Sequence, residues 1–358
     1  MQEVNVRMAT LKDIAEATGL SITTVSRVMN NTASEVGISL KTQKLVREAA
    51  RRLNYSPNLE ARNLRLGRRP RAVLFLSLFE STTYQEGFFS HPFFGELMHA
   101  IQSEVAATGS YLAYKAIDGN EPDEVESLLD DTVSAVISWG HVPPPLEELL
   151  LSKQIPVAAI EPYTKGETLH SIYVDNQLAV TQALTHLYEL GHRRISMAAL
   201  DFGNSDSNLA FFERCQAFET GTARLSPEVV GRVEHIARTA ETTDIEAGRR
   251  LGRRILEAPD RPTAIISVND LCAMGIIKAA KELGLNVPRD LSVVGIDDIE
   301  WSTHHEPALT TVRIPRQALA ETAVSIIQKL FRKNTLERKE VRIPTELIVR
   351  ESTSAART

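Results

Sequence analysis

From residue 71 onward, short and mostly apolar runs alternate with helix-like stretches, and this alternation constrains the fold more than any other feature. Runs of this length are typical of strands buried on both faces, as in parallel sheets covered by helices. The alternation predicts an α/β fold with parallel sheets, and its span of about 270 residues favours two lobes over one. The predicted strands are 72–78, 111–116, 135–139, 157–160, 195–200, 264–268 and 291–296.

The charge of the chain is unevenly distributed. The 358 residues carry a formal net charge of −6, which by itself argues against a nucleic-acid partner. Residues 1–71, however, hold 13 Lys and Arg against 6 Asp and Glu, a net charge of +7, so the remainder carries −13. A basic N-terminal piece on an acidic body predicts a separate domain that binds an anion.

The first 53 residues predict three short helices, at about 11–18, within 21–31 and at about 41–53. Gly19 permits a tight turn after the first helix, and Ser21 can cap the second. A support helix, a turn containing Gly and a second helix with one polar face are the pattern of a helix-turn-helix. The small core is predicted to contain Leu11, Ile14, Ala15, Thr18, Val25, Val28, Met29, Leu45, Val46, Ala49 and Leu53.

The outer face of the second helix carries short polar side chains and one cation. Thr23, Ser26 and Asn30 can bond phosphates or base edges, Arg27 can take guanine O6 and N7, and Ile22 can contact a thymine methyl. This composition predicts a surface that reads the major groove. The alternative is an amphipathic helix pair that belongs to an enzyme and contacts no DNA.

The segment 55–71 is basic and contains a second candidate DNA contact. Asn58 can cap a short helix at about 59–66, on which Leu64 is exposed beside Arg62 and Arg65. An apolar side chain presented in this way can enter the minor groove and unstack a base step. A basic linker without helical structure is the alternative.

The stretches "ATLKDIAEATGLSITTVSRVMNN", "VREAARRLNYSPN" and "ARNLR" resemble the headpiece and hinge of the lactose/galactose-repressor family. The resemblance implies operator contacts from one set of positions and minor-groove contacts from the hinge. Two departures are a longer loop at 31–39 and the acidic Glu60 in the hinge. The implied operator contacts are Leu11, Ser21, Ile22, Thr23, Thr24, Arg27 and Asn30, and the implied hinge contacts are Asn58, Ala61 and Leu64.

The resemblance extends to the body through "YVDNQLAVTQALTHLYELGHRRI", "PTAIISVNDLCAMGIIKAAKELGLNVPRDLSVVGIDD" and "EPALTTVRIP". It implies a two-lobed periplasmic-binding-protein-like fold with a small molecule in the cleft and crossings near 174, 312 and 341. The expected organisation is a headpiece at 1–57, a hinge at 58–70, a first lobe at 71–174 and 313–341, and a second lobe at 175–312 and 342–358.

Polar residues follow several predicted strands, where open α/β sheets bind ligands. Asp297, Glu161 and Asn269 each come at or directly after a strand, and Arg214 lies in the helix after the run 195–200. In sugar-responsive members of the family, the positions matching these four bond effector hydroxyls. The resemblance and the helix before Arg214 add Phe93, Phe94 and Asn208.

Most of the effector candidates also have a structural alternative. Asn269 can cap the following helix, Asp297 can bond a turn, Arg214 can be an exposed surface charge, and both phenylalanines can belong to the core. Thr243 occupies the position where several relatives place a stacking aromatic residue, a departure that argues against a planar, stacked effector.

No pattern in the sequence supports catalysis, a cofactor or a metal site. P-loop, G-x-G-x-x-G and G-x-S-x-G motifs are absent, and the adjacent His304 and His305 lack ligand-like spacing. Cys215 and Cys272 are far apart, as in a reducing compartment. The start resembles no signal peptide, whether translation begins at Met1 or Met8, and no run is long enough to span a membrane, so we expect a cytoplasmic protein.

The sequence therefore predicts a transcriptional regulator, most simply a repressor, that binds a palindromic operator as a homodimer. Its small-molecule effector is expected to be a sugar or sugar derivative, with a nucleobase or nucleoside as the alternative. A solute-binding protein would share the body but would lack the basic headpiece. Without leucine heptads at the end of the chain, no tetramer is expected.

Overall fold

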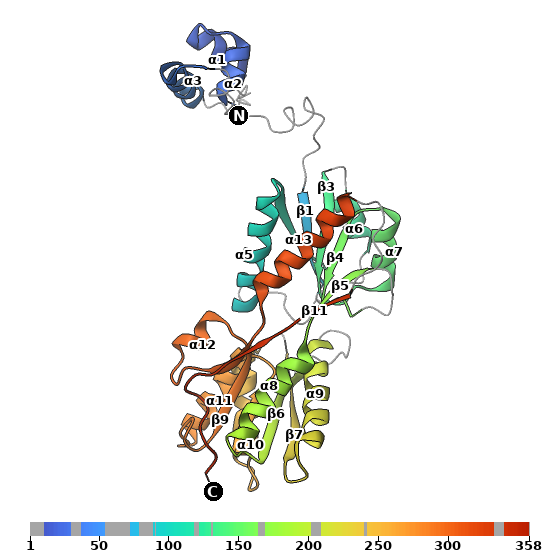
Figure 1. Cartoon of the computed structure of the whole chain (residues 1–358), viewed down its shortest axis with the longest axis vertical. Helices are drawn as coiled ribbons and strands as arrows, with labels where there is room; N and C mark the ends of the chain where they lie inside the picture. The colour runs from blue at the N-terminus through green and yellow to red at the C-terminus, as the bar shows by residue number, and fades with distance from the viewer. Residues whose placement is uncertain are drawn as a thin grey trace, which may run out of the picture. The chain divides into compact units, whose positions relative to one another are not determined.

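The computed structural model describes residues 11–29, 37–53, 72–78, 89, 91–117, 122–129, 132–163, 169–201, 209–239, 242–332 and 340–357. The chain forms two compact units, 1–70 and 71–358 (Figure 1). The whole predicted hinge lies outside the described residues, as do the candidate contacts Asn30, Asn58, Ala61, Leu64 and Asn208.

The headpiece contains the three predicted helices, α1 (Leu11–Thr18), α2 (Ile22–Met29) and α3 (Leu40–Arg52). One prediction for its core is wrong: the Leu45 side chain is 47% exposed. The inward face of α3 instead follows positions 46, 49 and 50, and Leu45 is rotated away from it by about 100°. The buried core consists of Ile14, Ala15, Val25, Val28, Val46, Ala49 and Ala50.

The body is α/β and contains two six-stranded sheets, parallel except where β12 pairs antiparallel with β10 (Figure 1). The first sheet has the order β11-β5-β4-β3-β1-β2, with bounds Glu340–Ile343, His170–Val174, Val157–Ile160, Val133–Trp139, Ala72–Leu78 and Tyr111–Ile117. The second has the order β12-β10-β9-β8-β6-β7, with bounds Glu346–Ile348, Thr310–Arg313, Ser292–Asp297, Ala264–Ser267, Arg194–Asp201 and Val230–Ala237.

Helices cover both sheets and make each the centre of a lobe. On β1, Val73 and Phe75 enter one apolar cluster while Leu74 and Leu76 enter another, so both faces of the first sheet are buried. The first lobe has α5 (Pro92–Ala107), α6 (Pro122–Leu128), α7 (Pro144–Ser152) and α13 (Arg316–Arg332). The second has α8 (Asn176–Glu189), α9 (Leu209–Leu225), α10 (Asp244–Leu256), α11 (Asp270–Glu282) and α12 (Glu300–His304).

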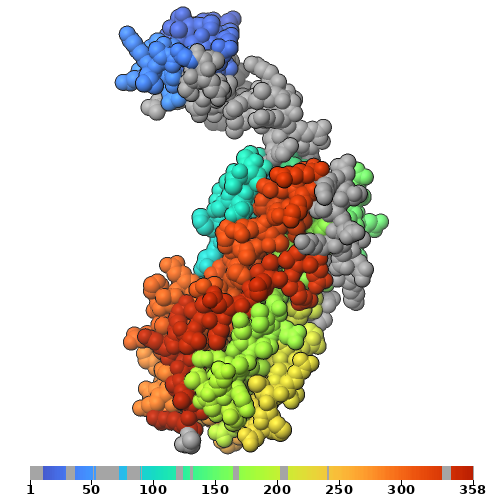
Figure 2. All heavy atoms as spheres, viewed as in Figure 1, coloured from blue at the N-terminus to red at the C-terminus, as the bar shows by residue number. Residues whose placement is uncertain are grey.

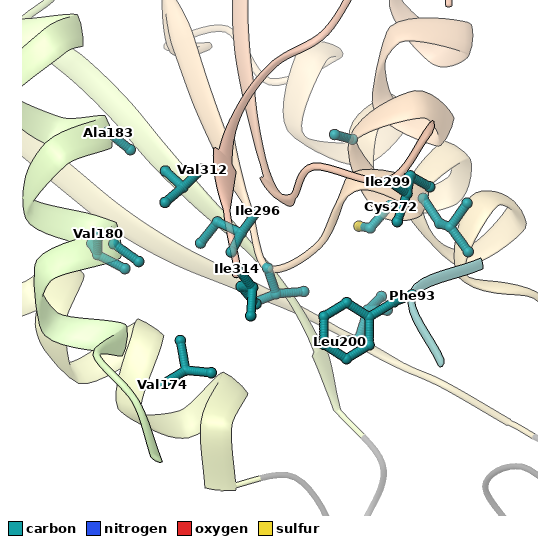
Figure 3. Close-up of a cluster of buried hydrophobic side chains, with 14 of the residues drawn as sticks. Phe93, Val174, Val180, Ala183, Leu200, Cys272, Ile296, Ile299, Val312 and Ile314 are labelled. Atoms are coloured by element: carbon teal, nitrogen blue, oxygen red, sulfur yellow. The ribbon is translucent and has the colours of Figure 1, made fainter. Parts of the chain in front are cut away.

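The chain passes between the lobes at 174–176, 313–316 and 343–346, because the elements on either side of each segment belong to different lobes. The third crossing lies after β11 and therefore two residues beyond the expected boundary at 341. After the second crossing, α13 packs beside α5 on the surface of the first lobe (Figures 1 and 2). One apolar cluster continues from lobe to lobe and includes Phe93, Val174, Leu200 and Ile314 (Figure 3).

The helices α10 and α11 cross so closely that glycine is required at the contact. A Cβ atom added at Gly275 would lie 2.1 Å from the backbone oxygen of Ile245, and one added at Gly248 would lie 2.2 Å from that of Cys272. We expect Gly275→Ala to lower the free energy of unfolding by about 1–3 kcal/mol, because neither backbone can move aside cheaply. Chemical denaturation measures the loss, with Lys278→Ala on the exposed side of α11 as the control. Equal stability of the two variants would contradict this packing.

Among the described residues, no helix is long and apolar enough to cross a membrane.

Candidate functional site

The N-terminus of α2 is organised by Ser21. Its hydroxyl accepts a hydrogen bond from the Thr24 backbone N–H at 3.1 Å and lies 2.8 Å from the Thr24 hydroxyl. Gly19, with φ +66°, makes the preceding turn in the left-handed region. The side-chain cap sets where α2 begins, and the turn sets its direction relative to α1.

The outer surface of α2 presents the predicted reading face. Val25 and Val28 point into the headpiece core, which leaves Ile22, 49% exposed, together with Thr23 and Arg27 on the outside. Leu11 is half-buried against the core and Thr24 is half-buried beside Ser21. The arrangement offers an apolar tip, hydroxyls and a guanidinium on one helix face, which suits base edges and phosphates.

A pocket of about 700 Å³ of empty space, partly open to solvent, lies where the two lobes face each other. Its walls are formed where strands of both sheets end, with Trp139 at the end of β3 and Asp297 at the end of β9. All the effector candidates that the structure describes line this pocket: Phe93, Phe94, Glu161, Arg214, Asn269 and Asp297.

Arg214 is buried in the pocket wall, with 4% of its surface exposed. Its Nε donates to Asn176 Oδ1 at 2.8 Å, and its Nη1 donates to the backbone oxygen of Val268. The guanidinium also lies over the Phe211 ring at 5.4 Å. The alternative of an exposed surface charge is therefore wrong, and the cation is held at a fixed place in the pocket.

Glu161 lies on the wall of the first lobe and is 3% exposed. Its backbone is in the left-handed region at φ 52°, and its Oε1 accepts a hydrogen bond from the Val174 N–H at 2.5 Å. Burial raises the pKa of Glu161 to about 7, although the Tyr163 hydroxyl and the Val174 N–H favour the charged form. The carboxyl group therefore changes its charge near neutral pH.

Asp297 lies on the opposite wall, at the end of β9. Burial raises its pKa to about 7, against the opposing effect of the Arg214 charge. Its backbone is left-handed at φ 137°, and its carbonyl oxygen accepts a hydrogen bond from Arg316 Nη1 at 2.6 Å. This backbone conformation, unusual for a residue other than glycine, marks a turn that is held by its neighbours.

Asn269 has the capping role that its sequence position allowed. Its Oδ1 accepts a hydrogen bond from the Cys272 N–H at 2.8 Å at the start of α11, and its Nδ2 donates to Asp244 Oδ2 at 2.7 Å. Asp244 is itself paired with Arg238 at 2.8 Å. Asn269 therefore lines the pocket with a side chain already bonded to the protein, which makes it a positioning residue there.

The aromatic lining is larger than the sequence reasoning predicted. Phe93, Phe94 and Trp139 form a cluster with ring centroids 5.3–5.6 Å apart. Both phenylalanines are buried and both line the pocket, so each belongs to the apolar core and to the pocket wall at the same time. Trp139 was missed although it ends a predicted strand, the same feature that identified the polar candidates. Tyr163, His141 and Phe211 were missed as well.

Polar contacts join the lobes at the edge of the pocket. His91, just before α5, lies 3.7 Å from Asp244 at the start of α10. Arg316 pairs with Glu96 of α5 at 2.7 Å while bonding the carbonyl oxygen of Asp297 in the other lobe. A ligand between the walls would therefore act on groups that set how the lobes meet.

Comparisons with known proteins agree with this architecture. Residues 10–58 match the description "Bacterial regulatory proteins, lacI family", and residues 184–353 match "Periplasmic binding protein-like domain". The NTD biosynthesis operon regulator NtdR of Bacillus subtilis is 30% identical over 97% of this chain and 100% of the relative. The HTH-type transcriptional repressor PurR of Haemophilus influenzae is 27% identical over 96% of this chain and 98% of the relative.

Solved structures share the fold over nearly the whole chain. A Lac repressor bound to ONPG in the repressed state has a TM-score of 0.74 and 25% identity, with 97% of this chain and 100% of that chain covered. A complex of the transcriptional regulator CelR with cellobiose has a TM-score of 0.65 and 24% identity, with 96% and 99% covered. With a helix-turn-helix headpiece, a two-lobed body and these full-length relatives, the chain belongs to the lacI family of DNA-binding transcriptional regulators.

Proposed function

We propose that this protein is a repressor that binds a palindromic operator as a homodimer and responds to a sugar or sugar derivative held between its lobes. The evidence for a sugar as the effector is the lining of the pocket. It contains the aromatic cluster of Phe93, Phe94 and Trp139 together with the buried Arg214 and Asp297. A sugar ring offers C–H faces that pack on aromatic rings and a rim of hydroxyls that bond charged groups. The CelR structure contains cellobiose, a sugar.

A nucleobase or nucleoside is the second candidate, because the same three aromatic rings could stack on a planar base. Thr243, at the position of the stacking aromatic in several relatives, instead caps α10 by accepting a hydrogen bond from the Glu246 N–H at 3.2 Å. The sugar proposal is preferred because ionisable side chains on both walls suit several hydroxyls at once.

For DNA, we propose that the α2 face reads the major groove of each half-site. Ser21, at the start of α2, suits a phosphate, and Arg27 suits a guanine edge. Repressors of this design act in the cytoplasm, where the operator is. Leu11, Ile22, Thr23, Thr24 and Asn30 complete the proposed major-groove set, and Asn58, Ala61 and Leu64 the proposed minor-groove set.

Arg27→Ala is expected to abolish preference for operator over scrambled DNA while leaving the melting temperature unchanged. The lost guanine contact is worth about 1–3 kcal/mol per half-site, and a dimer loses it twice. Competition binding on the two DNA sequences measures the preference, with the exposed Lys12→Ala on α1 as the control. A variant that still selects operator at moderate salt would show that α2 is not the reading helix.

Thermal unfolding in the presence of a ligand panel tests the effector class. A ligand at 100 times its dissociation constant adds about 2.7 kcal/mol to the free energy of unfolding. The panel contains sugars, sugar phosphates, glycosides, nucleobases and nucleosides, and sugars are expected to raise the melting temperature. Measuring operator binding with and without a sugar that binds then shows whether the sugar strengthens or weakens operator binding. The coupling free energy between two such sites is typically about 1–3 kcal/mol. Stabilisation by nucleosides alone would replace the sugar proposal with the second candidate.

A further inference from the structure

The turn at Asp297 and Asp298, which places one side chain in the pocket wall, has an unusual backbone. Both residues are in the left-handed region, with φ of 137° at Asp297 and 55° at Asp298. A residue other than glycine keeps such a conformation only where its surroundings hold it there. The groups that bond this turn therefore decide where the Asp297 side chain lies in the pocket.

Arg316 bonds this turn from the other lobe. It is the first residue of α13 in the first lobe, whereas the turn lies at the end of β9 in the second. Its Nη1 donates to the Asp297 carbonyl oxygen at 2.6 Å, and its Nη2 donates to the Asp298 carbonyl oxygen at 2.8 Å. One guanidinium thus bonds two successive carbonyl groups across the boundary between the lobes.

Glu96 of α5 completes this contact from the first lobe. Its Oε2 lies 2.7 Å from Arg316 Nη2, and its Oε1 accepts a hydrogen bond at 3.3 Å from the Glu300 N–H at the start of α12. The Arg316 side chain is 14% exposed and lies over the Phe93 ring of the pocket, 5.6 Å from its centroid. Because this guanidinium is desolvated and has several acceptors, it is held more firmly than an exposed ion pair would be.

The Asp298 carboxylate ties the same turn to two of the crossings between the lobes. Arg313, where the second crossing begins, donates to Asp298 Oδ2 at 2.7 Å, and Arg350, beyond the third crossing, donates to Oδ1 at 2.5 Å. A shift of the turn would therefore disturb the contacts at both crossings as well as the contact with Arg316.

We propose that Glu96 and Arg316 form a latch that joins the two lobes and positions Asp297 for the effector. The inference rests on the proposed function only where it assigns Asp297 to effector binding. A ligand that bonds the Asp297 side chain favours the conformation of the turn that Arg316 also bonds, so effector binding and contact between the lobes strengthen each other. Arg316 is a positioning residue, because it acts through the turn.

The accessibility of Trp139 tests the latch on the full-length protein without any effector. The chain has two tryptophans, Trp139 in the pocket and the exposed Trp301, so Trp301→Phe leaves the pocket residue as the only indole. In this background, Arg316→Met should raise the acrylamide quenching constant of Trp139 by about twofold or more, because a larger share of the molecules has parted lobes.

Two controls separate the latch from other effects of a substitution. Arg332→Met, at the exposed far end of α13, should leave the quenching constant unchanged. Gly275→Ala is expected to lower stability at the contact between α10 and α11, so it shows whether lower stability alone exposes Trp139. Thermal melting checks that every variant is folded.

A double-mutant cycle tests whether Glu96 and Arg316 act as one unit. Glu96→Gln removes the negative charge that pairs with Arg316 but keeps a side-chain oxygen for the Glu300 N–H. It should also raise the quenching constant, and combining it with Arg316→Met should add little further increase, because residues that share one contact are not additive.

Sugar binding tests the positioning of Asp297. Glucose, galactose, ribose and cellobiose are titrated into the wild-type protein and into Arg316→Met, with calorimetry as the measurement. A sugar that binds the wild-type protein should bind the variant about 10-fold more weakly, because the turn that carries Asp297 is no longer held by the first lobe.

The outcomes separate this inference from the function on which it rests. A quenching constant that stays at the wild-type value in folded Arg316→Met, or that rises as much in either control, would overturn the latch. Fully additive effects in the double variant would overturn the pairing with Glu96, and an unchanged sugar affinity would overturn the positioning of Asp297. Failure of all four sugars to bind the wild-type protein would count against the sugar effector, while the quenching result would still decide the latch.

Discussion

Operator affinity is expected to fall roughly 10³-fold or more between 50 and 200 mM salt. A dimer presents two basic headpieces, each within a segment of net charge +7, and neutralising about six or more phosphates gives a loss of this size through counterion release. The acidic body, at −13, adds nothing to this attraction. The steep dependence would therefore come from the first 71 residues alone.

Fluorescence anisotropy with a labelled operator measures the slope of log affinity against log salt. Lys44→Ala on α3, whose side chain is exposed and lies 3.9 Å from Glu48, tests a single cation outside the α2 face. It should change the slope by no more than about one unit. A flat curve for the wild-type protein would contradict binding through phosphates and with it the nucleic-acid function.

Removing the charge of Arg214 is expected to abolish the effector response while leaving operator binding intact. Arg214→Met keeps much of the side-chain volume but deletes the donors to Asn176 and Val268 and the cation beside Asp297. Deleting one member of a buried charged network typically costs about 2–5 kcal/mol in binding, so the affinity for the effector should fall by roughly 30-fold or more. The headpiece has its own core, so DNA binding should persist.

The measurement is operator binding at rising concentrations of a sugar that stabilises the wild-type protein. Arg224→Met on the exposed side of the same helix is the matched control and should respond as the wild type does. Because the variant loses one member of a buried charged network, Arg214→Met should also melt at a lower temperature than the wild-type protein. The melting temperatures of both proteins are measured without ligand. An unchanged effector response in a folded Arg214→Met protein would remove Arg214 from the site.

Local sequence patterns were enough to predict the helices and strands whose buried residues recur at a regular spacing. The helix at 11–18 and the strands at 72–78 and 157–160 have the predicted bounds, because their apolar spacing matches the face that is buried. The effector candidates at strand ends also converge on one pocket, since parallel strands of one sheet end at the same edge. This much depends on neighbours a few residues apart.

Tertiary structure decided what depends on distant partners. The strands β5, β7, β10, β11 and β12 were missed; β7 is an edge strand with a mostly exposed surface, and the others have only three to five residues. Arg214 could be a surface charge or a pocket cation until Asn176, 38 residues away, and Val268, 54 residues away, were seen to bond it. The sequence by itself determined the family of regulator and the position of the cleft. The fold alone decided which side chains are desolvated in that cleft, because burial depends on contacts between both lobes that no local pattern records.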